Sequence, residues 1–230
     1  MDQTQGEKVG KSNAARKAVE LVKDGMTIGL GSGSTVELFV KELGKKVAHE
    51  GIEVYVIPSS YQSHILAVQN GLTVTDFFQV DEPDICIDGA DQVDGEFNLI
   101  KGGGAALTRE KIVASASKEF YVMVDSSKIV EKLSKPVPVE ILPFAFGYVK
   151  KRIAELGGRC VLREGTGKLM PVISDNGNFI ADCSFDSIDA QLASELSNIP
   201  GLIEHGIFLS DMVDAVIVGY GEGARVLKNE

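Results

Sequence analysis

Acidic side chains cluster in the stretch DGADQVD (88–94), which directly follows a short apolar run. Asp88 and Asp91 stand where a buried strand would end, and α/β sheets bind ligands at the carboxyl ends of their strands. The alternative is a solvated turn, for which Asp and Gly are also typical. A calcium loop of the EF-hand type is excluded. It needs glycine at its sixth position and glutamate at its twelfth, and counting from Asp88 these are Val93 and Leu99.

A second unusual stretch, KGGGAALTREK (101–111), places a lysine, three glycines and a glutamate in sequence. Consecutive glycines cost chain entropy and are favoured where the backbone passes close to a ligand. Lys101 precedes them, and in the helix predicted to follow, Ala106, Glu110 and Val113 share one face. Burial on that face would make Glu110 a better proton acceptor near neutral pH. The alternative is that Glu110 is exposed beside its two basic neighbours.

The stretch GLGSGST (29–35) joins a predicted strand to a predicted helix. Glycines allow close backbone approach, and the N–H groups of a helix N-terminus favour an anion. Gly33 and the hydroxyl groups of Ser32, Ser34 and Thr35 are therefore candidates for binding phosphate. The stretch is not a Walker A loop, and it matches the dinucleotide fingerprint only in part, because position 34 is serine. The alternative is a tight turn in which Ser34 or Thr35 caps the helix.

Strand-like and helix-like segments alternate in the first half of the chain, which indicates a doubly wound parallel sheet. This is the framework that would bring the three stretches to one edge of a sheet. The predicted helices are 12–24, 34–47, 61–71 and 105–120, and the predicted strands are 26–31, 52–60, 84–91 and 120–128.

The pattern changes at 132–144, where three of the seven prolines lie. Beyond it we predict a small α+β domain over 134–206, with an Asn-Gly hairpin turn in SDNGNF. The apolar run at 214–219 is typical of a strand that returns to the main sheet. The larger domain is therefore expected to comprise 1–133 plus 207–230.

The composition excludes several classes of partner. The formal net charge of −10 opposes binding to nucleic acid or to an anionic membrane. The N-terminus lacks the apolar stretch of a signal peptide, and no run approaches the length of a membrane span. Three cysteines without a CxxC pair do not indicate a disulfide framework or a zinc site. We expect a cytoplasmic protein without a metal or cofactor.

Taken together, GLGSGST, DGADQVD and KGGGAALTREK resemble, in order and spacing, the type A ribose-5-phosphate isomerases. The stretches PSS (58–60) and VDSSK (124–128) fit as well, and the resemblance covers nearly the whole chain. It implies a Rossmann-like domain with a smaller α+β (ferredoxin-like) domain, and a homodimer or homotetramer. It also implies metal-free conversion of D-ribose 5-phosphate to D-ribulose 5-phosphate through an enediolate, a step of the non-oxidative pentose phosphate pathway.

The resemblance also implies roles for the catalytic candidates. Glu110 is similar to the general base that moves a proton between C2 and C1, and Lys101 to the cation beside the developing oxyanion. Asp88 and Asp91 match the groups that bind the sugar hydroxyls and assist ring opening.

A further set of residues matches the phosphate-binding region of the family. Ser32, Ser34 and Thr35 lie in the loop that often reads Gly-Thr-Gly-Ser-Thr in relatives, so the serine at 32 is a departure that keeps the hydroxyl group. Lys11 and Lys128 match basic positions near the substrate phosphate.

Two other functions stay open on sequence grounds. Glucosamine-6-phosphate deaminases and 6-phosphogluconolactonases also bind sugar phosphates, but they would be expected to use a catalytic histidine, and His49, His64 and His205 lie in no comparable motif. A sugar-phosphate sensor of a transcription regulator would carry a DNA-binding module ahead of the sensor. About 25 residues precede the first predicted strand here, too few for that module.

Overall fold

The structure, a computed structural model, describes residues 3–166 and 171–229. The chain folds into two units, each with its own hydrophobic core. Among the described residues, the first unit takes those within Met1–Ala90, Arg109–Ile129 and Ser210–Glu230, and the second takes Asp91–Thr108 and Val130–Leu209.

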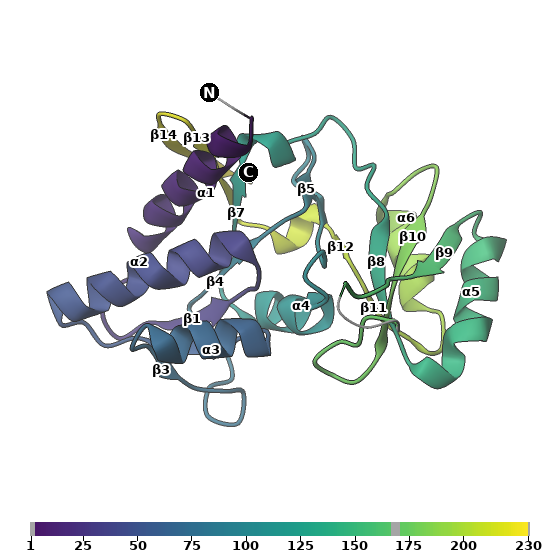
Figure 1. The fold of residues 1–230 in the computed structure, drawn as a ribbon, viewed down its shortest axis with the longest axis horizontal. Helices are drawn as coiled ribbons and strands as arrows, with labels where there is room; N and C mark the ends of the chain where they lie inside the picture. Colours follow the sequence, from purple (N-terminus) through teal and green to yellow (C-terminus); the bar gives the residue numbers. More distant parts are fainter. Residues whose placement is uncertain (1–2, 167–170, 230) are drawn as a thin grey trace. The chain divides into compact units, whose positions relative to one another are not determined.

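Seven strands form the sheet of the first unit, in the order β14-β13-β7-β4-β1-β2-β3 (Figure 1). All neighbours are parallel except β14, which is antiparallel to β13. Numbered along the chain, the six parallel strands follow the 3-2-1-4-5-6 order of a doubly wound Rossmann fold, as predicted. The strands are β1 (Thr27–Leu30), β2 (Tyr55–Pro58), β3 (Thr73–Val74), β4 (Ile85–Gly89), β7 (Phe120–Asp125), β13 (Ala215–Tyr220) and β14 (Gly223–Lys228).

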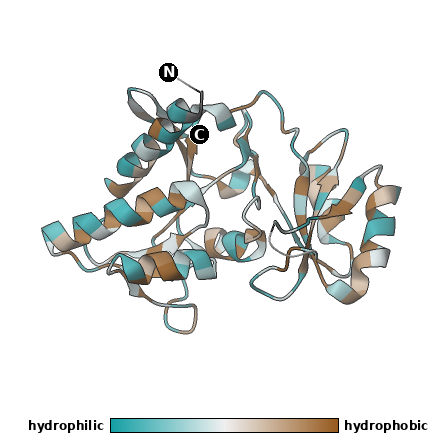
Figure 2. Cartoon of the chain, viewed as in Figure 1, coloured by the Kyte–Doolittle hydropathy of each residue, from teal (hydrophilic) through white to brown (hydrophobic). Residues whose placement is uncertain are grey.

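Helices cover this sheet, and the central strands are therefore continuous apolar runs. On one face, α1 and α2 pack against Ile28, Leu30 and Ile87. Helix α2 meets the sheet through an apolar stripe that includes Phe39 and Leu43, and most of its exposed residues are polar (Figure 2). The helices are α1 (Gln3–Val19), α2 (Ser34–Glu50), α3 (Tyr61–Gln69) and α4 (Leu107–Ala116), with the short 3₁₀ segments η1 (Ser126–Lys128) and η3 (Ser210–Met212).

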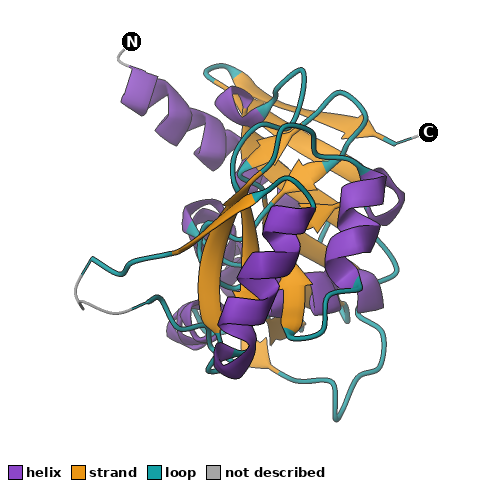
Figure 3. Cartoon of the chain, turned by 90° about the vertical axis from the view of Figure 1, so that its right-hand side faces the viewer, coloured by secondary structure: helices purple, strands orange, loops and turns teal. Residues whose placement is uncertain are grey.

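The second unit contains a four-stranded antiparallel sheet in the order β11-β8-β10-β9. With α5 and α6, these strands form a β-α-β-β-α-β unit, which is the predicted ferredoxin-like arrangement. Both helices pack on one face of the sheet and share a single core with it (Figure 3). The elements are β8 (Val137–Ile141), η2 (Pro143–Ala145), α5 (Phe146–Glu155), β9 (Arg159–Leu162), β10 (Phe179–Ser184), α6 (Ala190–Ser197) and β11 (Leu202–His205).

A buried carboxylate fixes the predicted Asn-Gly turn of this unit. Ser174 N donates to Asn178 O at 2.9 Å, which closes the turn. Glu140 of β8 is fully buried, and it accepts hydrogen bonds from Ser174 Oγ (2.7 Å), Asn178 Nδ2 (2.7 Å) and Thr108 Oγ1 (2.5 Å). A carboxylate without such donors would be costly to bury, so this cluster explains how the turn is held to the sheet.

The two units divide the chain differently from the predicted domains at three places. Residues 91–108, 130–133 and 207–209, expected in the larger domain, group with the second unit, and 91–108 is the longest of these segments. The reason is a small sheet of order β12-β6-β5, in which β5 (Gln92–Val93) and β6 (Leu99–Ile100) pair with each other and β6 pairs with β12 (Ile207–Phe208). Two-residue strands carry too little pattern to be recognised in a sequence.

In residues 3–166 and 171–229, no helix combines the length and the apolar character needed to cross a membrane.

Candidate active site

The glycine-serine stretch forms the turn between β1 and α2, at the point where the strand order reverses. Gly31 is required there, because a Cβ atom at this position would lie 1.8 Å from Asp88 Cγ. Gly33 has φ +100°, a conformation that favours glycine, and it forms the N-cap of α2. The predicted caps Ser34 and Thr35 are instead the first two residues of the helix. The turn therefore opens directly onto a helix N-terminus, as an anion site requires.

Hydroxyl groups from two turns meet around Ser32. Its Oγ donates to Ser60 Oγ at 2.7 Å and lies 3.0 Å from Ser59 Oγ. Gly33 N donates to Gln62 Oε1 at 2.9 Å, so the start of α3 also holds the turn. Sequence analysis missed Gln62, which lies in an ordinary helical stretch and carries no motif.

Helix α1 brings a cation to the same turn. Lys11 Nζ donates to Ser34 Oγ at 3.2 Å. The helix reaches this position because Gly10 lies against Gly219 of β13, where a Cβ atom on Gly10 would be 2.8 Å from Gly219 O. Lys128, the other predicted basic residue, ends η1 just after β7 and is half-buried. Lys11 is thus placed at the helix N-terminus by a close backbone contact.

Asp88 stands at the end of β4 and is fully buried. Its Oδ1 accepts hydrogen bonds from Gly89 N at 2.6 Å and from Ser32 N at 3.2 Å. The second bond joins the aspartate stretch to the glycine-serine turn, as expected for neighbouring strands at a switch point.

Glu110 lies on α4 and is 4% exposed. Ala106 and Val113, with which it was predicted to share a face, are also buried. The helix packs closely on β1, since a Cβ atom at Gly29 would lie 2.4 Å from Val113 Cγ1. A carboxylate fixed on a buried helix face suits a proton acceptor, because it is shielded from bulk water and held in one place.

Asp91 and Lys101 belong to the second unit. Asp91 Oδ2 accepts from Gly103 N at 2.8 Å, so the aspartate stretch and the glycine stretch meet there. Lys101 is 2% exposed; its backbone N donates to Gly206 O at 2.8 Å, and its Nζ lies 5.4 Å from the ring centre of Phe208. Such an ammonium group is desolvated on one side by the aromatic ring, which strengthens its field at a nearby anion.

An arginine that sequence analysis missed holds the glycine stretch. Arg163 Nη1 donates to Gly102 O (2.9 Å) and Gly103 O (3.1 Å). The guanidinium is itself fixed by a two-bond pair with Asp182, through Nε (2.9 Å) and Nη2 (2.5 Å). Bidentate pairs of this kind impose orientation. Only the fold brings Arg163 to this loop, so no local signal could have identified it.

Among the residues that the structure describes, no group of three or more His, Cys, Asp or Glu side chains is arranged to hold a metal ion.

Comparison with known proteins identifies the family. The model of ribose 5-phosphate isomerase A (phosphoriboisomerase A) matches residues 55–223. Ribose-5-phosphate isomerase A of Archaeoglobus fulgidus is 56% identical over 222 residues, which cover 95% of this chain and 98% of that protein.

Two solved structures with a similar fold come from the same family. Ribose 5-phosphate isomerase A from Methanocaldococcus jannaschii has a TM-score of 0.91 at 45% identity, covering 95% of this chain and 97% of that one. A D-ribose-5-phosphate isomerase in complex with phospho-erythronic acid has a TM-score of 0.92 at 43% identity, covering 97% and 99%. The chain belongs to the ribose 5-phosphate isomerase A family.

Proposed function

We propose that this chain interconverts D-ribose 5-phosphate and D-ribulose 5-phosphate by general acid–base catalysis through an enediolate, without a metal or cofactor. The observation that carries the proposal is the pair of buried carboxylates, Asp88 and Glu110, in the unit where Lys11 reaches the serine turn. Family membership supports the substrate. One relative was solved in complex with phospho-erythronic acid, which, like ribose 5-phosphate, carries a phosphate group and several hydroxyl groups.

In the proposed reaction, Glu110 takes the proton from C2 of the open-chain aldose, and the C1 carbonyl becomes the oxyanion of an enediolate. The ammonium group of Lys101 stabilises that charge. A proton passes from O2 to O1, assisted by Asp88 and Asp91, which also bind the sugar hydroxyls. Glu110 then returns its proton to C1, which leaves the C2 carbonyl of the ketose and restores the carboxylate.

The phosphate is proposed to bind at the N-terminus of α2. Gly33 is proposed to let the backbone approach the phosphate closely, Ser34 supplies a backbone N–H group, and the hydroxyl groups of Ser32 and Thr35 add donors. Lys11 contributes a positive charge on a protein whose net charge is −10, with Lys128 as a second cation. A local cation is needed here because the overall field repels an anionic substrate.

We further propose that the chain works in the cytoplasm, in the non-oxidative pentose phosphate pathway, as an assembly of identical copies. A small phosphorylated sugar is the only partner that the proposed reaction needs.

The direct test is to incubate the purified protein with ribose 5-phosphate and excess chelator and to follow ketose formation. Rapid, chelator-resistant formation of ribulose 5-phosphate is expected. Binding of the sugar without ketose formation would reject the isomerase and favour a sensor. Turnover of glucosamine 6-phosphate or 6-phosphogluconolactone instead would assign a different enzyme, and turnover abolished by the chelator would reject the metal-free mechanism.

A further inference from the structure

Two of the three cysteines face each other in the sheet of the second unit. Cys160 of β9 and Cys183 of β10 are directly opposite in the antiparallel register, and both side chains belong to the core of that unit. Both are free thiols in the structure. The register thus brings together two thiols that are far apart in the sequence and form no CxxC motif.

The pair stands where neighbouring strands bring their side chains closest. Arg163 N donates to Ile180 O at 2.9 Å, and hydrogen-bonded and non-hydrogen-bonded pairs alternate along an antiparallel ladder. Counted three residues along each strand from that bond, the Cys160–Cys183 pair is non-hydrogen-bonded. The Cα atoms of such pairs lie about 4.5 Å apart, which is within the range of about 4.4–6.8 Å that a disulfide spans. The two cysteines are therefore placed to be joined by a disulfide bond.

The two thiols differ in their acidity. The hydrogen bond from Cys183 lowers the pKa of Cys160, and the positive charge of Lys150 adds to this effect, while burial and the charge of Asp182 oppose it. The same hydrogen bond, followed by burial, raises the pKa of Cys183. Because the thiolate is the nucleophile and the form that is oxidised, Cys160 is the more reactive of the two.

A groove of about 450 Å³ leads to Cys160 from outside. Its walls come from α5, β9 and the residue before β9, and Cys160 lines it. The charged residues among those that line it are Lys150 and Arg159, and positive charge favours a thiolate. β9 is the edge strand of its sheet, and Cys160 is 4% exposed whereas Cys183 is fully buried. A small oxidant therefore reaches Cys160 first.

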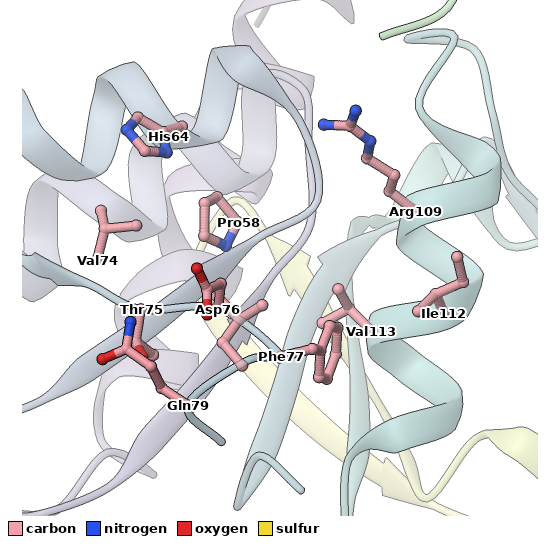
Figure 4. Close-up of a pocket in the computed structure, with 11 residues that line it drawn as sticks. Pro58, His64, Val74, Thr75, Asp76, Phe77, Gln79, Arg109, Ile112 and Val113 are labelled. Carbon is pink, nitrogen blue, oxygen red and sulfur yellow. The ribbon is translucent and has the colours of Figure 1, made fainter. Parts of the chain in front are cut away.

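Cys86, the third cysteine, stands in a different environment. It lies in β4 at 1% exposure, and the residues opposite it in the neighbouring strands are Gly29 and Phe120, neither of which can supply a thiol. The pocket of about 380 Å³ in the same unit is walled by β2, α3, the segment after β3, and α4, and Cys86 is not among its lining residues (Figure 4). Cys86 is therefore an internal control for any reaction of the pair.

We infer that Cys160 and Cys183 form an oxidative modification site, at which a peroxide converts the two thiols to a disulfide that thiol reductants reopen. The Cys160 thiolate attacks one oxygen of hydrogen peroxide, the O–O bond breaks, and Cys160 sulfenic acid and hydroxide form. The Cys183 sulfur then attacks the Cys160 sulfur, and the S–O bond breaks as the sulfenic oxygen leaves as water with the Cys183 proton.

The electrons and atoms balance without a further reactant. Two thiols lose two electrons, the peroxide gains them, and the products are one disulfide and two water molecules. A dithiol reductant restores both thiols by exchange through a mixed disulfide. In a reducing compartment such a disulfide is transient, as expected for redox sensing. The inference does not depend on the proposed isomerase reaction.

The first experiment uses the wild-type chain. The reduced protein is treated with hydrogen peroxide, the peroxide is removed, and the free thiols are alkylated with N-ethylmaleimide after denaturation. We expect the chain to lose two of its three alkylation sites, and peptide mapping without reductant to link position 160 to position 183, while Cys86 stays alkylated. Dithiothreitol should restore all three sites. Three sites retained after peroxide, or a disulfide that includes Cys86, would overturn the inference.

The second experiment tests the order of the two steps. Cys183→Ala removes the thiol that closes the disulfide, so Cys160 sulfenic acid should accumulate and be trapped by dimedone. Cys160→Ala removes the thiol that reacts first and should give no adduct at position 183. Cys86→Ala is the matched control and should form the disulfide as the wild type does, with circular dichroism verifying the fold of each variant. An adduct on Cys183 in Cys160→Ala, or an adduct in neither variant, would overturn the assigned order.

Discussion

At the scale of single residues, the proposed chemistry depends most on Glu110. Glu110→Gln keeps the size of the side chain and removes the base. We expect kcat to fall by about 10²–10⁴-fold, the usual contribution of a general base, with little change in KM. Steady-state kinetics with ribose 5-phosphate measure both constants, and calorimetry checks that the variant still binds the sugar.

Two variants serve as controls for this experiment. Glu131→Gln removes an exposed carboxylate and should leave both constants unchanged. Ser34→Ala removes a hydroxyl group from the proposed phosphate site and should mainly raise KM. Near-normal turnover by Glu110→Gln would contradict the proposed mechanism.

Site residues that lie in a sequence motif or follow helical spacing could be predicted from the sequence. Site residues that reach the site only through contacts distant in the chain could not. Burial of Glu110 was predictable because helical spacing places it with Ala106 and Val113. Arg163 was not, because its contact with Gly102 joins residues 61 apart in the chain. Gln62 was missed for a similar reason: its partner, the N–H of Gly33, lies 29 residues away in the chain. Supporting contacts of this kind are products of the fold.

At the scale of elements, the position of α1 controls the position of Lys11. Gly10→Ala would place a Cβ atom 2.8 Å from Gly219 O, so the helix must shift. We expect a loss of about 1–3 kcal/mol in the free energy of unfolding, as for other overpacked sites, and a higher KM for ribose 5-phosphate. Urea unfolding and steady-state kinetics measure these effects.

Gly6 provides the matched control on the same helix. A Cβ atom there meets nothing within 4 Å, so Gly6→Ala should be neutral or stabilise the protein by up to about 1 kcal/mol. Equal behaviour of the two variants would show that the contact between α1 and β13 does not set the position of Lys11.

The elements themselves were predicted unevenly, for physical reasons. Five strands of the large sheet, β1, β2, β4, β7 and β13, were predicted because continuous apolar runs between turn signals are distinctive, whereas β3 and β14 were not. Helix α1 was placed at 12–24 but occupies Gln3–Val19, because its buried face consists of small residues, Ala14, Ala15 and Ala18, and its first turns are polar. Such a helix is held by close packing, and periodicity of large apolar residues does not reveal it.

An ion pair links the beginnings of three strands. Asp84 precedes β4, and its carboxylate accepts from Lys118 Nζ at 2.7 Å and from Thr27 N at 2.9 Å. The bond from Lys118, followed by that from Thr27, lowers the pKa of Asp84 below its ordinary value. The same pair raises the pKa of Lys118. Asp84 therefore stabilises the fold above its unfolded pKa and loses this effect as the pH falls, whereas the contribution of Lys118 is lost only at alkaline pH.

Lys118→Met should consequently destabilise the protein at pH 7 and do so less at pH 3, because the contribution of Asp84 is lost as the pH falls. The effect should be small, because the Lys118 and Asp84 side chains are 52% and 34% exposed. Urea midpoints at the two pH values measure it. Lys151→Met, which alters a more exposed lysine, is the control. A deficit that is as large at pH 3 as at pH 7 would show that packing of the lysine stem, rather than its charge, matters.

At the scale of the whole molecule, the chain contains two separate hydrophobic cores. Every buried member of the first cluster belongs to the first unit, and every member of the second to the second unit. Ile28 and Ile153 are fully buried representatives of the two. The change of pattern near the prolines led us to predict two domains, but the prediction placed residues 91–108 in the larger one, whereas they group with the second unit.

Because the two cores are separate, we expect a destabilising substitution in one unit to lower the local stability of that unit and leave the other unchanged. Ile153→Ala and Ile28→Ala should each cost about 2–5 kcal/mol of local stability, as large-to-small core changes do. Hydrogen exchange measured by mass spectrometry should accelerate in β8 and β10 for Ile153→Ala, and in β4 and β7 for Ile28→Ala, since exchange reports the stability of each cooperative unit. Equal acceleration in both units by either variant would mean that the chain unfolds as one cooperative body. In that case the two cores would be separate in their packing but not in their energetics.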